Sequence, residues 1–313
     1  MRTTILALVA SASVGLVVVG AQQGRPPQPD ADSVQIGVQH VQGNVYMLTG
    51  VDANVTVQVG NDGVLLVDTQ VAELAPRVIA AVRTLSTGPI RWIVNTNFHG
   101  DHTGGNDALA RLGTTPASLG RPRIVANEHV VRRMVASPTV SRDAWPNDDY
   151  FTPEKDFFFN GEAVVVSHIP AAHTDGDSIV FFRRSDVISA GDVFTPGRYP
   201  AIDLQAGGGV QGIIDGVNAI IRLAVPAKYQ EGGTYVIPGH GRLCDEADVV
   251  EYREMVTIVR DRVQDLLRKG LTIEQVKAAR PTSDYDAEYK NPGSPTPDMF
   301  VEAVYRSLAA RKS

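Results

Sequence analysis

The sequence predicts an α/β (α+β) fold, and two observations support this prediction. Between residues 34 and 238, short runs rich in Val, Ile and Leu alternate with stretches whose apolar residues recur at helical spacing. Beyond residue 245 the apolar residues follow helical spacing alone. The chain has 313 residues, of which 43% are hydrophobic, and this is ample for one large core. We therefore expect a single folded domain over residues 33–313.

Residues 1–21 have the composition of a signal peptide. Arg2 precedes an apolar run at residues 5–19, and small residues lead to a cleavage site near Ala21. The run is shorter than the roughly 20 residues that a membrane span needs, so an uncleaved anchor is the weaker alternative and no stable span is expected. Residues 22–32, rich in Pro and Gly, are expected to form a disordered lead-in. Export to a periplasm or beyond is therefore expected.

The first half of the domain is predicted to contain two hairpins, a helix and a further strand. Gly43 separates the first two strands, and the Gly60–Gly63 segment is a strong turn between the next two. Leu74, Val78 and Val82 form an apolar stripe on the helix. The predicted elements are strands Val34–Val41, Asn44–Leu48, Asn54–Val59 and Val64–Val67, helix Glu73–Leu85 and strand Ile90–Val94.

Strands and helices continue through the second half. Thr272 and Gln275 form a capping-box pattern that opens one short helix. Phe151–Phe159 is aromatic and turn-rich, and it is expected either to flank the core as a loop or to form a mobile wall of the active site. The other predicted elements are strands Arg123–Ala126, Ala163–Ile169, Ser178–Phe182, Asp186–Ala190 and Thr234–Ile237, and helices Asn127–Val135, Val210–Leu223, Glu246–Arg268 and Pro297–Leu308.

A cluster of polar residues directly follows the strand Ile90–Val94. Imidazole and carboxylate groups at this density suit zinc or a similar divalent ion. The alternative is a polar turn with unrelated histidines. Asn106 is expected to cap the helix Asp107–Leu112. The cluster reads Asn95-Thr96-Asn97-Phe98-His99-Gly100-Asp101-His102-Thr103-Gly104-Gly105-Asn106.

The segment from Asn97 to His102 resembles the His-x-His-x-Asp-His signature of the metallo-β-lactamase superfamily, with Asn97 in place of the first His. Three other motifs of the family have counterparts in the family's order, and the four together are specific. The resemblance implies the four-layer αββα metallo-β-lactamase sandwich, here with a C-terminal helical extension. The three other motifs are Ala172-His173-Thr174-Asp175-Gly176, Ser189-Ala190-Gly191-Asp192-Val193 and Pro238-Gly239-His240-Gly241.

The resemblance also implies a metal centre. Asp101 is expected to orient the nucleophile as well as to bind metal, and Asp68 is expected to support the site without binding metal. The expected cofactor is Zn²⁺, with one tight site and a second weak one because an amide oxygen is a poorer zinc ligand than imidazole; Mn or Fe are alternatives. The implied ligands are Asn97, His99 and His173 for the first metal, Asp101, His102 and His240 for the second, and Asp192 between them.

These features imply an exported zinc-dependent hydrolase in which metal-bound hydroxide attacks the carbonyl of an ester, lactone, thioester or amide. A small molecule with such a carbonyl is the expected partner. One alternative is a β-lactamase, because the Asp-His-His set resembles one β-lactamase subclass. The other is a non-catalytic metal- or ligand-binding accessory protein, in which Asn97 has impaired the site. No G-x-S-x-G motif is present, and this disfavours a serine mechanism.

Several features are expected to be unrelated to the site. The net charge is −6 and no basic cluster occurs, so nucleic acid is not an expected partner. The single cysteine, Cys244, is expected to be a buried or idle thiol rather than a ligand. The G-x-G-x-x-G match at Gly207–Gly212 does not open a βαβ unit, so it is interpreted as a flexible loop before a helix. His40, His129 and His168 are expected to be structural or exposed.

Overall fold

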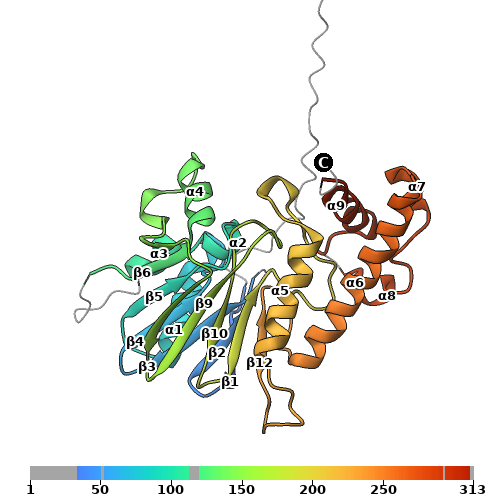
Figure 1. The fold of residues 1–313 in the computed structure, drawn as a ribbon. Coiled ribbons are helices and arrows are strands. Elements are labelled where there is room, and N and C mark those ends of the chain that lie inside the picture. Colours follow the sequence, from blue (N-terminus) through green and yellow to red (C-terminus); the bar gives the residue numbers. More distant parts are fainter. Residues whose placement is uncertain (1–33, 51–52, 113–119, 292, 311–313) are drawn as a thin grey trace, which may run out of the picture.

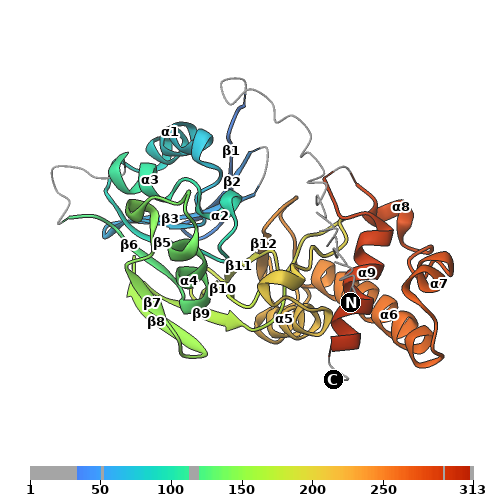
Figure 2. The same cartoon turned by 90° about the horizontal axis from the view of Figure 1, so that it is seen from above.

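Two β-sheets packed face to face form the centre of the structure, a computed structural model that describes residues 34–50, 53–112, 120–291 and 293–310 (Figure 1). The expected signal peptide and lead-in lie outside the described residues. Helices cover the outer face of each sheet, so that the layers run helix, sheet, sheet, helix (Figure 2). The predicted four-layer αββα sandwich is confirmed.

The first sheet combines antiparallel hairpins with parallel strands. Its strands lie in sequence order; β1 to β4 pair antiparallel, and β4 to β7 pair parallel. Both predicted hairpins are present. The strands are β1 (Gly37–Gln42), β2 (Val45–Thr49), β3 (Val55–Gly60), β4 (Gly63–Val67), β5 (Ile90–Val94), β6 (Arg123–Asn127) and β7 (Asp148–Tyr150).

The second sheet has the order β12-β11-β10-β9-β8. Strands β11 and β12 are parallel, whereas the other neighbours are antiparallel. The parallel pairing sends the carboxyl ends of β11 and β12 to the same edge of the sheet. The strands are β8 (Glu154–Phe159), β9 (Glu162–Ile169), β10 (Asp177–Phe182), β11 (Val187–Gly191) and β12 (Tyr235–Pro238).

The helices fall at or near the predicted positions, with two short additions. Asn127 caps α4, since its side chain accepts a hydrogen bond from the His129 N–H, and Thr272 and Gln275 form the predicted capping box of α7. The additions are α2 and α8. The helices are α1 (Ala75–Leu85), α2 (Gly100–Thr103), α3 (Asn106–Leu112), α4 (Glu128–Ala136), α5 (Val210–Leu223), α6 (Glu246–Arg268), α7 (Ile273–Ala278), α8 (Asp286–Tyr289) and α9 (Pro297–Ala310).

Alternation of side chains along the strands explains how one sheet serves two cores. In β4, Val64 and Leu66 pack against α1 and α3, whereas Leu65 and Val67 point into the layer between the sheets. In β12, Val236 and Ile237 divide in the same way between the helix-covered face and the layer between the sheets. Near-continuous apolar strands are therefore required, because both faces of each sheet are buried.

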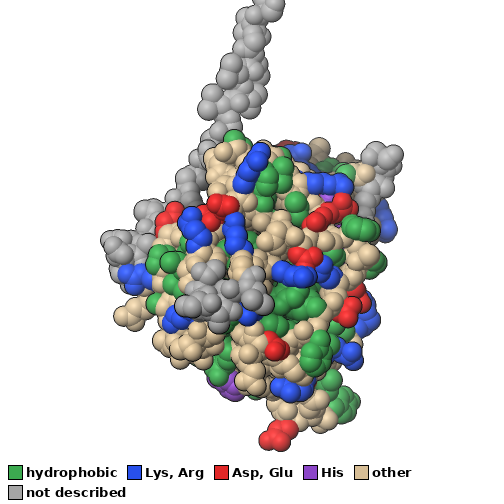
Figure 3. Space-filling view, turned by 90° about the vertical axis from the view of Figure 1, so that its left-hand side faces the viewer, with side chains coloured by type: hydrophobic (Ala, Val, Ile, Leu, Met, Phe, Trp, Pro, Cys, Tyr) green, Lys and Arg blue, Asp and Glu red, His purple; other side chains and the backbone are tan. Residues whose placement is uncertain are grey.

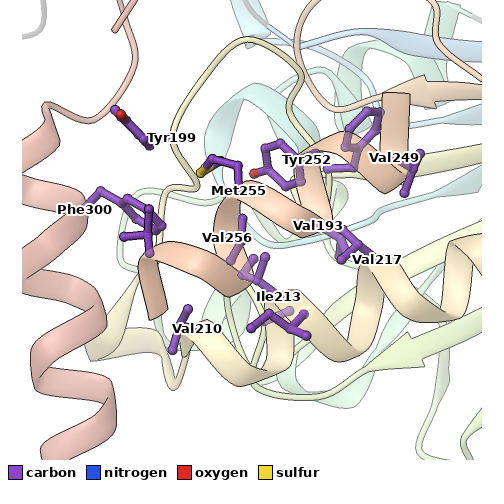
Figure 4. Packing of buried hydrophobic residues seen from close by; sticks show 14 of the residues in the cluster. Val193, Tyr199, Val210, Ile213, Val217, Val249, Tyr252, Met255, Val256 and Phe300 are labelled. Atoms are coloured by element: carbon purple, nitrogen blue, oxygen red, sulfur yellow. The ribbon is translucent and has the colours of Figure 1, made fainter. Parts of the chain in front are cut away.

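The largest cluster of buried apolar residues joins the second sheet to helices α5, α6 and α9. Val217 of α5 and Val256 of α6 belong to it, and Phe300 brings α9 into the same cluster (Figure 4). The helices after residue 245 are thus packed onto the sandwich. Among the described residues, no helix is both long and apolar enough to cross a bilayer. On the face drawn in Figure 3, acidic and basic side chains are interspersed.

Two sequence predictions are corrected. Phe151–Phe159 is not a loop, because β8 occupies most of it and pairs with β9 at the sheet edge. Its Phe157 ring stacks on Trp92, with 4.0 Å between ring centroids. Asn106 does not cap α3 but lies in its first turn. The reason is that the buried Asn106 side chain is already engaged by Asn95.

Candidate metal centre

The residues of the four motifs meet at one edge of the sandwich because each follows the end of a strand. His173 follows β9, Asp192 follows β11 and His240 follows β12. The segment after β5 carries the other candidate ligands, and part of it forms the single helical turn α2. Strands β9, β11 and β12 run in the same direction, because β9 and β11 both pair antiparallel with β10 and β12 pairs parallel with β11. Their carboxyl ends therefore lie at the same edge of the second sheet, and this topology brings residues distant in sequence into one site.

Asp68 fixes the position of His102. Its Oδ2 atom lies 2.7 Å from His102 Nδ1, and both residues are buried. The same carboxylate accepts hydrogen bonds from the Thr96 N–H and hydroxyl, at 2.8 and 2.7 Å. A His that donates one ring N–H to a carboxylate presents its other nitrogen to a metal. This geometry agrees with the expectation that Asp68 supports the site without binding metal.

His99, His173 and Asp192 form the first of two groups that could hold a metal ion. One potential ligand atom from each lies within 4.8 Å of the others. His99 Nδ1 and His173 Nε2 are 2.9 Å apart, and Asp192 Oδ2 is 3.4 Å from His173 Nε2. On its outer side, His173 Nδ1 lies 2.6 Å from the carbonyl of Ala201, and this contact orients the ring with Nε2 inward.

Asp101, His102 and His240 form the second group, again within 4.8 Å. Asp101 Oδ2 lies 3.4 Å from His240 Nε2 and 3.7 Å from His102 Nε2. Asp192 lies between the groups, because its two oxygens are 3.2 Å from His102 and 3.3 Å from His240 while Oδ2 also faces His173. This is the intermediate position that the sequence resemblance implied.

The carboxylates and imidazoles of the centre shift one another's pKa values. Burial lowers the pKa of His240, but the carboxylates of Asp192 and Asp101 outweigh it and raise that pKa to about 9. His102 has its pKa raised in the same way, by Asp192, Asp68 and Asp101 against burial. Conversely, burial favours a higher pKa for Asp101 and Asp192, but the neighbouring imidazoles hold the pKa of each well below its usual range. The carboxylates are therefore ionised, and the centre is built to receive positive charge.

Asn97 lies beside the centre but is not placed like the other candidates. Its Oδ1 accepts a hydrogen bond from the His99 N–H at 2.9 Å, and its Nδ2 is 3.5 Å from Asp192 Oδ2. The amide oxygen thus braces the turn that carries His99. The amide group faces the carboxylate with its donor side, so Asn97 is arranged to support the centre rather than to add an anionic or imidazole ligand.

Glycines in the motifs let backbone segments approach closely. A Cβ on Gly105 would lie 2.3 Å from the Thr69 carbonyl oxygen, and one on Gly239 would lie 2.2 Å from Asp192 Oδ1. The G-x-G-x-x-G run has the same role, because a Cβ on Gly212 would be 1.8 Å from the carbonyl oxygen of Ala171, next to the His173 loop. This run opens α5, as expected, but it is tightly packed rather than a freely flexible loop.

Asp203 is a site residue that sequence reasoning missed. Its Oδ2 lies 3.2 Å from His99 Nε2, and this hydrogen bond, helped by the Ala206 N–H, lowers the pKa of Asp203 to about 2 despite partial burial. Asp203 thereby directs His99 Nδ1 toward His173. It sits in the irregular segment between β11 and α5, where no motif marks it. The one available signal was that the segment follows Asp192 directly.

A cavity of about 300 Å³ opens onto the centre. The segment after β11 and the turn between α8 and α9 complete its wall. Phe151–Phe159 does not line it. The residues that line the cavity are His99, Asp101, His173, Asp192, Thr195, Arg198, Tyr199, Ala201, His240, Gly293 and Pro295.

Other candidate residues lie elsewhere. Cys244 is buried and its thiol is 3.3 Å from the Arg242 carbonyl oxygen, outside both groups. His40 is exposed and contacts the Gly43 carbonyl. His129 and His168 both lie near Asp175, at 3.5 Å from its carboxylate and 2.8 Å from its carbonyl respectively. These placements agree with the idle and structural roles expected for them.

The donor set fits a divalent metal. Two groups of nitrogen and oxygen atoms face each other across a few ångströms, while Asp68, the Ala201 carbonyl and Asp203 hold the outer nitrogens of His102, His173 and His99. Outer partners of this kind set the tautomer of metal-binding imidazoles. Mixed imidazole and carboxylate donors are typical of zinc and also suit other transition metals.

Residues 48–240 match the family model described as the metallo-beta-lactamase superfamily, and all seven predicted ligands lie in that span. No curated protein matches the chain.

Three solved structures illustrate the likeness of fold. A stereoselective inverting sec-alkylsulfatase from Pseudomonas sp. has a TM-score of 0.62 and 18% identity; the match covers 87% of this chain but 50% of that one, so this chain spans about half its length. A metallo-β-lactamase from Pontibacter korlensis gives 0.56 and 17%, with 71% and 99% covered. The DIM-1 metallo-β-lactamase gives 0.55 and 16%, with 72% and 98% covered. At these identities the likeness concerns the fold alone.

Proposed function

We propose, because the chain belongs to the metallo-β-lactamase superfamily, that it is an exported zinc-dependent hydrolase that cleaves an ester, lactone, thioester or amide of a small molecule. The observation that supports this most is the pair of groups, His99-His173-Asp192 and Asp101-His102-His240, which face one cavity. The composition of residues 1–21 supports export.

The side chains have separable roles in this proposal. The two groups would hold metal, with Asp192 shared between them and Asn97 bracing the turn of His99. Metal in such a site supplies a Lewis acid that polarises a carbonyl and makes water acidic enough to lose a proton near neutral pH. Asp101 is partly exposed to the cavity, with 16% of its side chain accessible, so its carboxylate can accept a hydrogen bond from the attacking water and orient it.

The test is metal analysis combined with a substrate panel. Protein reconstituted with zinc should hydrolyse at least one member of a panel of aryl esters, lactones, thioesters and amides, and a chelator should abolish this turnover. Zinc should restore it. Turnover that persists in metal-free protein would contradict the proposal.

A β-lactam substrate is the second candidate. It is favoured by the Asp101-His102-His240 group and by likeness of fold to two metallo-β-lactamases over nearly their whole lengths. A chromogenic cephalosporin distinguishes it, because only a β-lactamase would cleave that compound with an efficiency well above that for simple esters. An accessory protein would instead bind zinc and hydrolyse neither the members of the substrate panel nor the cephalosporin.

A further inference from the structure

Arg198 brings a positive charge to the cavity over the metal centre. Among the described residues that line this cavity, it is the single Lys or Arg, and it shares the wall with His99, Asp101 and His240. The side chain is half-buried. A Cβ built on Gly293 would lie 4.0 Å from Arg198 Nη1, so the guanidinium runs beside the turn that precedes α9.

The guanidinium of Arg198 has no carboxylate partner in the described part of the chain. Among the residues that the structure describes, none forms an ion pair within 4.0 Å or a side-chain hydrogen bond with it. Arg133, also half-buried, shows the contrasting case, because it binds Asp175 through two nitrogens at 3.2 and 2.6 Å. A structural arginine at this degree of burial normally has such a partner, since unpaired buried charge is costly.

The backbone that carries Arg198 is firmly held. Its N–H donates to the Thr195 carbonyl, and the next residue, Tyr199, is buried. The Tyr199 ring stacks on Phe300 at 5.1 Å between centroids, and its hydroxyl donates to Asp286 at 2.9 Å. The charge is therefore presented from a rigid base, an arrangement that reduces the entropy lost when a ligand binds.

We propose that Arg198 binds an anionic group of the substrate, of carboxylate or sulfonate type, remote from the carbonyl that is cleaved. The planar fork of a guanidinium matches such anions with two parallel hydrogen bonds. The inference rests on the proposed hydrolase function and adds a substrate class to it. Neutral substrates of the same shape bind more weakly, because nothing in them neutralises Arg198.

Matched aryl esters test this specificity. The 4-nitrophenyl monoester of glutaric acid carries a remote carboxylate, 4-nitrophenyl butyrate is its neutral counterpart, and the 4-sulfobutyrate ester tells carboxylate from sulfonate. Arg198→Ala should lower kcat/KM at least about tenfold for the anionic esters, mainly through KM, and less than about twofold for the neutral one. Arg198→Lys should restore part of the loss. Arg222→Ala, at an exposed site in a separate groove, is the control.

A binding measurement separates this inference from the hydrolase proposal. Calorimetry with 5-oxohexanoate, which carries a carboxylate and a ketone in place of the cleavable carbonyl group, should give a Kd at least about tenfold weaker for Arg198→Ala than for the unmodified protein. If no member of the ester, lactone, thioester and amide panel is hydrolysed although metal is bound, the hydrolase proposal fails while calorimetry still decides the role of Arg198. Equal loss on anionic and neutral esters, equal 5-oxohexanoate affinity in both proteins, or no 5-oxohexanoate binding would each overturn the inference.

Discussion

Two carboxylates, those of Asp192 and Asp101, have a large influence on the charge of the centre, because they raise the pKa of His102 and of His240 against the effect of burial. Asp192 faces His102, His173 and His240 at 3.2–3.4 Å, and Asp101 Oδ2 lies 3.4 Å from His240 Nε2. Removing one of these groups takes away charge or coordination that no adjacent side chain replaces. Changes at Asp101 and His240 are thus the sharpest single-residue tests of the site.

Asp101→Ala and His240→Ala should each lose bound zinc and more than about 100-fold in kcat/KM, because loss of an outer partner alone costs roughly 10–100-fold. Metal content and turnover are measured on the same samples. His40→Ala, at an exposed position, is the control and should retain both. If either site variant kept full zinc and full turnover, the residue assignment would be wrong.

Cys244 should be an unreactive thiol. Burial, reinforced by the charge of Asp248, raises its pKa from 9.0 to about 12, so at pH 8 only about one native thiol in ten thousand is ionised. A disulfide reagent should modify the native protein far more slowly than the urea-unfolded protein. The native rate should climb about tenfold per pH unit up to pH 10, whereas the unfolded rate levels off above pH 9. Equal rates at pH 8 would show that the thiol is accessible and ionisable.

The sequence identifies the motif residues but not their outer partners. Asp101, His102 and His240 belong to local motifs that follow strand ends, so their convergence can be anticipated. Asp203 and Arg198 belong to a segment whose path depends on long-range contacts, such as Tyr199 with Asp286. Local pattern carries no record of such contacts, and both residues were therefore found only in the structure.

At the scale of elements, the position of the helical turn α2 depends on Gly105, which follows it. Thr69 donates two hydrogen bonds to the His102 carbonyl, through N–H and hydroxyl, each at 3.0 Å. Gly105 lies against the carbonyl of the same Thr69. Thr69 therefore has two roles: its carbonyl leaves no room for a side chain at Gly105, and its N–H and hydroxyl hold the backbone of the candidate ligand His102.

Gly105→Ala should therefore destabilise the fold by about 1–3 kcal/mol, because its Cβ would meet backbone at 2.3 Å. It should also weaken zinc binding, by shifting the turn. Gly100→Ala is the matched control, since a Cβ there has nothing within 4 Å, and its unfolding free energy should stay within about 1 kcal/mol of the original. Urea unfolding measures both. Equal midpoints for the two variants would refute this account of the glycines.

Elements with strong local signals were predicted well. Helices α5 and α6 have the predicted bounds, since an amphipathic stripe over many turns is unambiguous. Strand β8 was missed because Phe157, Phe158 and Phe159 are consecutive and hide any alternation. Its strand conformation comes from pairing with β9, a tertiary contact that overrides local pattern.

At the scale of the whole molecule, the C-terminal region contributes to the site through the turn between α8 and α9, and to the core through its helices. Gly293 and Pro295 line the cavity, and Phe300 anchors α9 in the cluster of α5 and α6. The sequence predicted a helical extension but not that it reaches the metal centre. The way in which one element packs on another depends on contacts between distant parts of the chain. The periodicity of apolar residues gives no information about those contacts.

Export is also a property of the whole chain. If residues 1–21 are a signal peptide, the mature protein recovered from its native host should begin at or near Gln22. N-terminal sequencing of that material is the measurement. Met1 on cytoplasmic protein would remove both the signal peptide and the periplasmic location.

Titration of metal-free protein with zinc tests the metal centre most directly. We expect one ion bound tightly by the group with Asp101, His102 and His240, and a second bound weakly, because Asn97 uses its oxygen on the His99 N–H. Asn97→His should gain a second tight site. Two equally tight ions in the unmodified protein would contradict the one-metal account, and no tight zinc at all would contradict the metal centre itself.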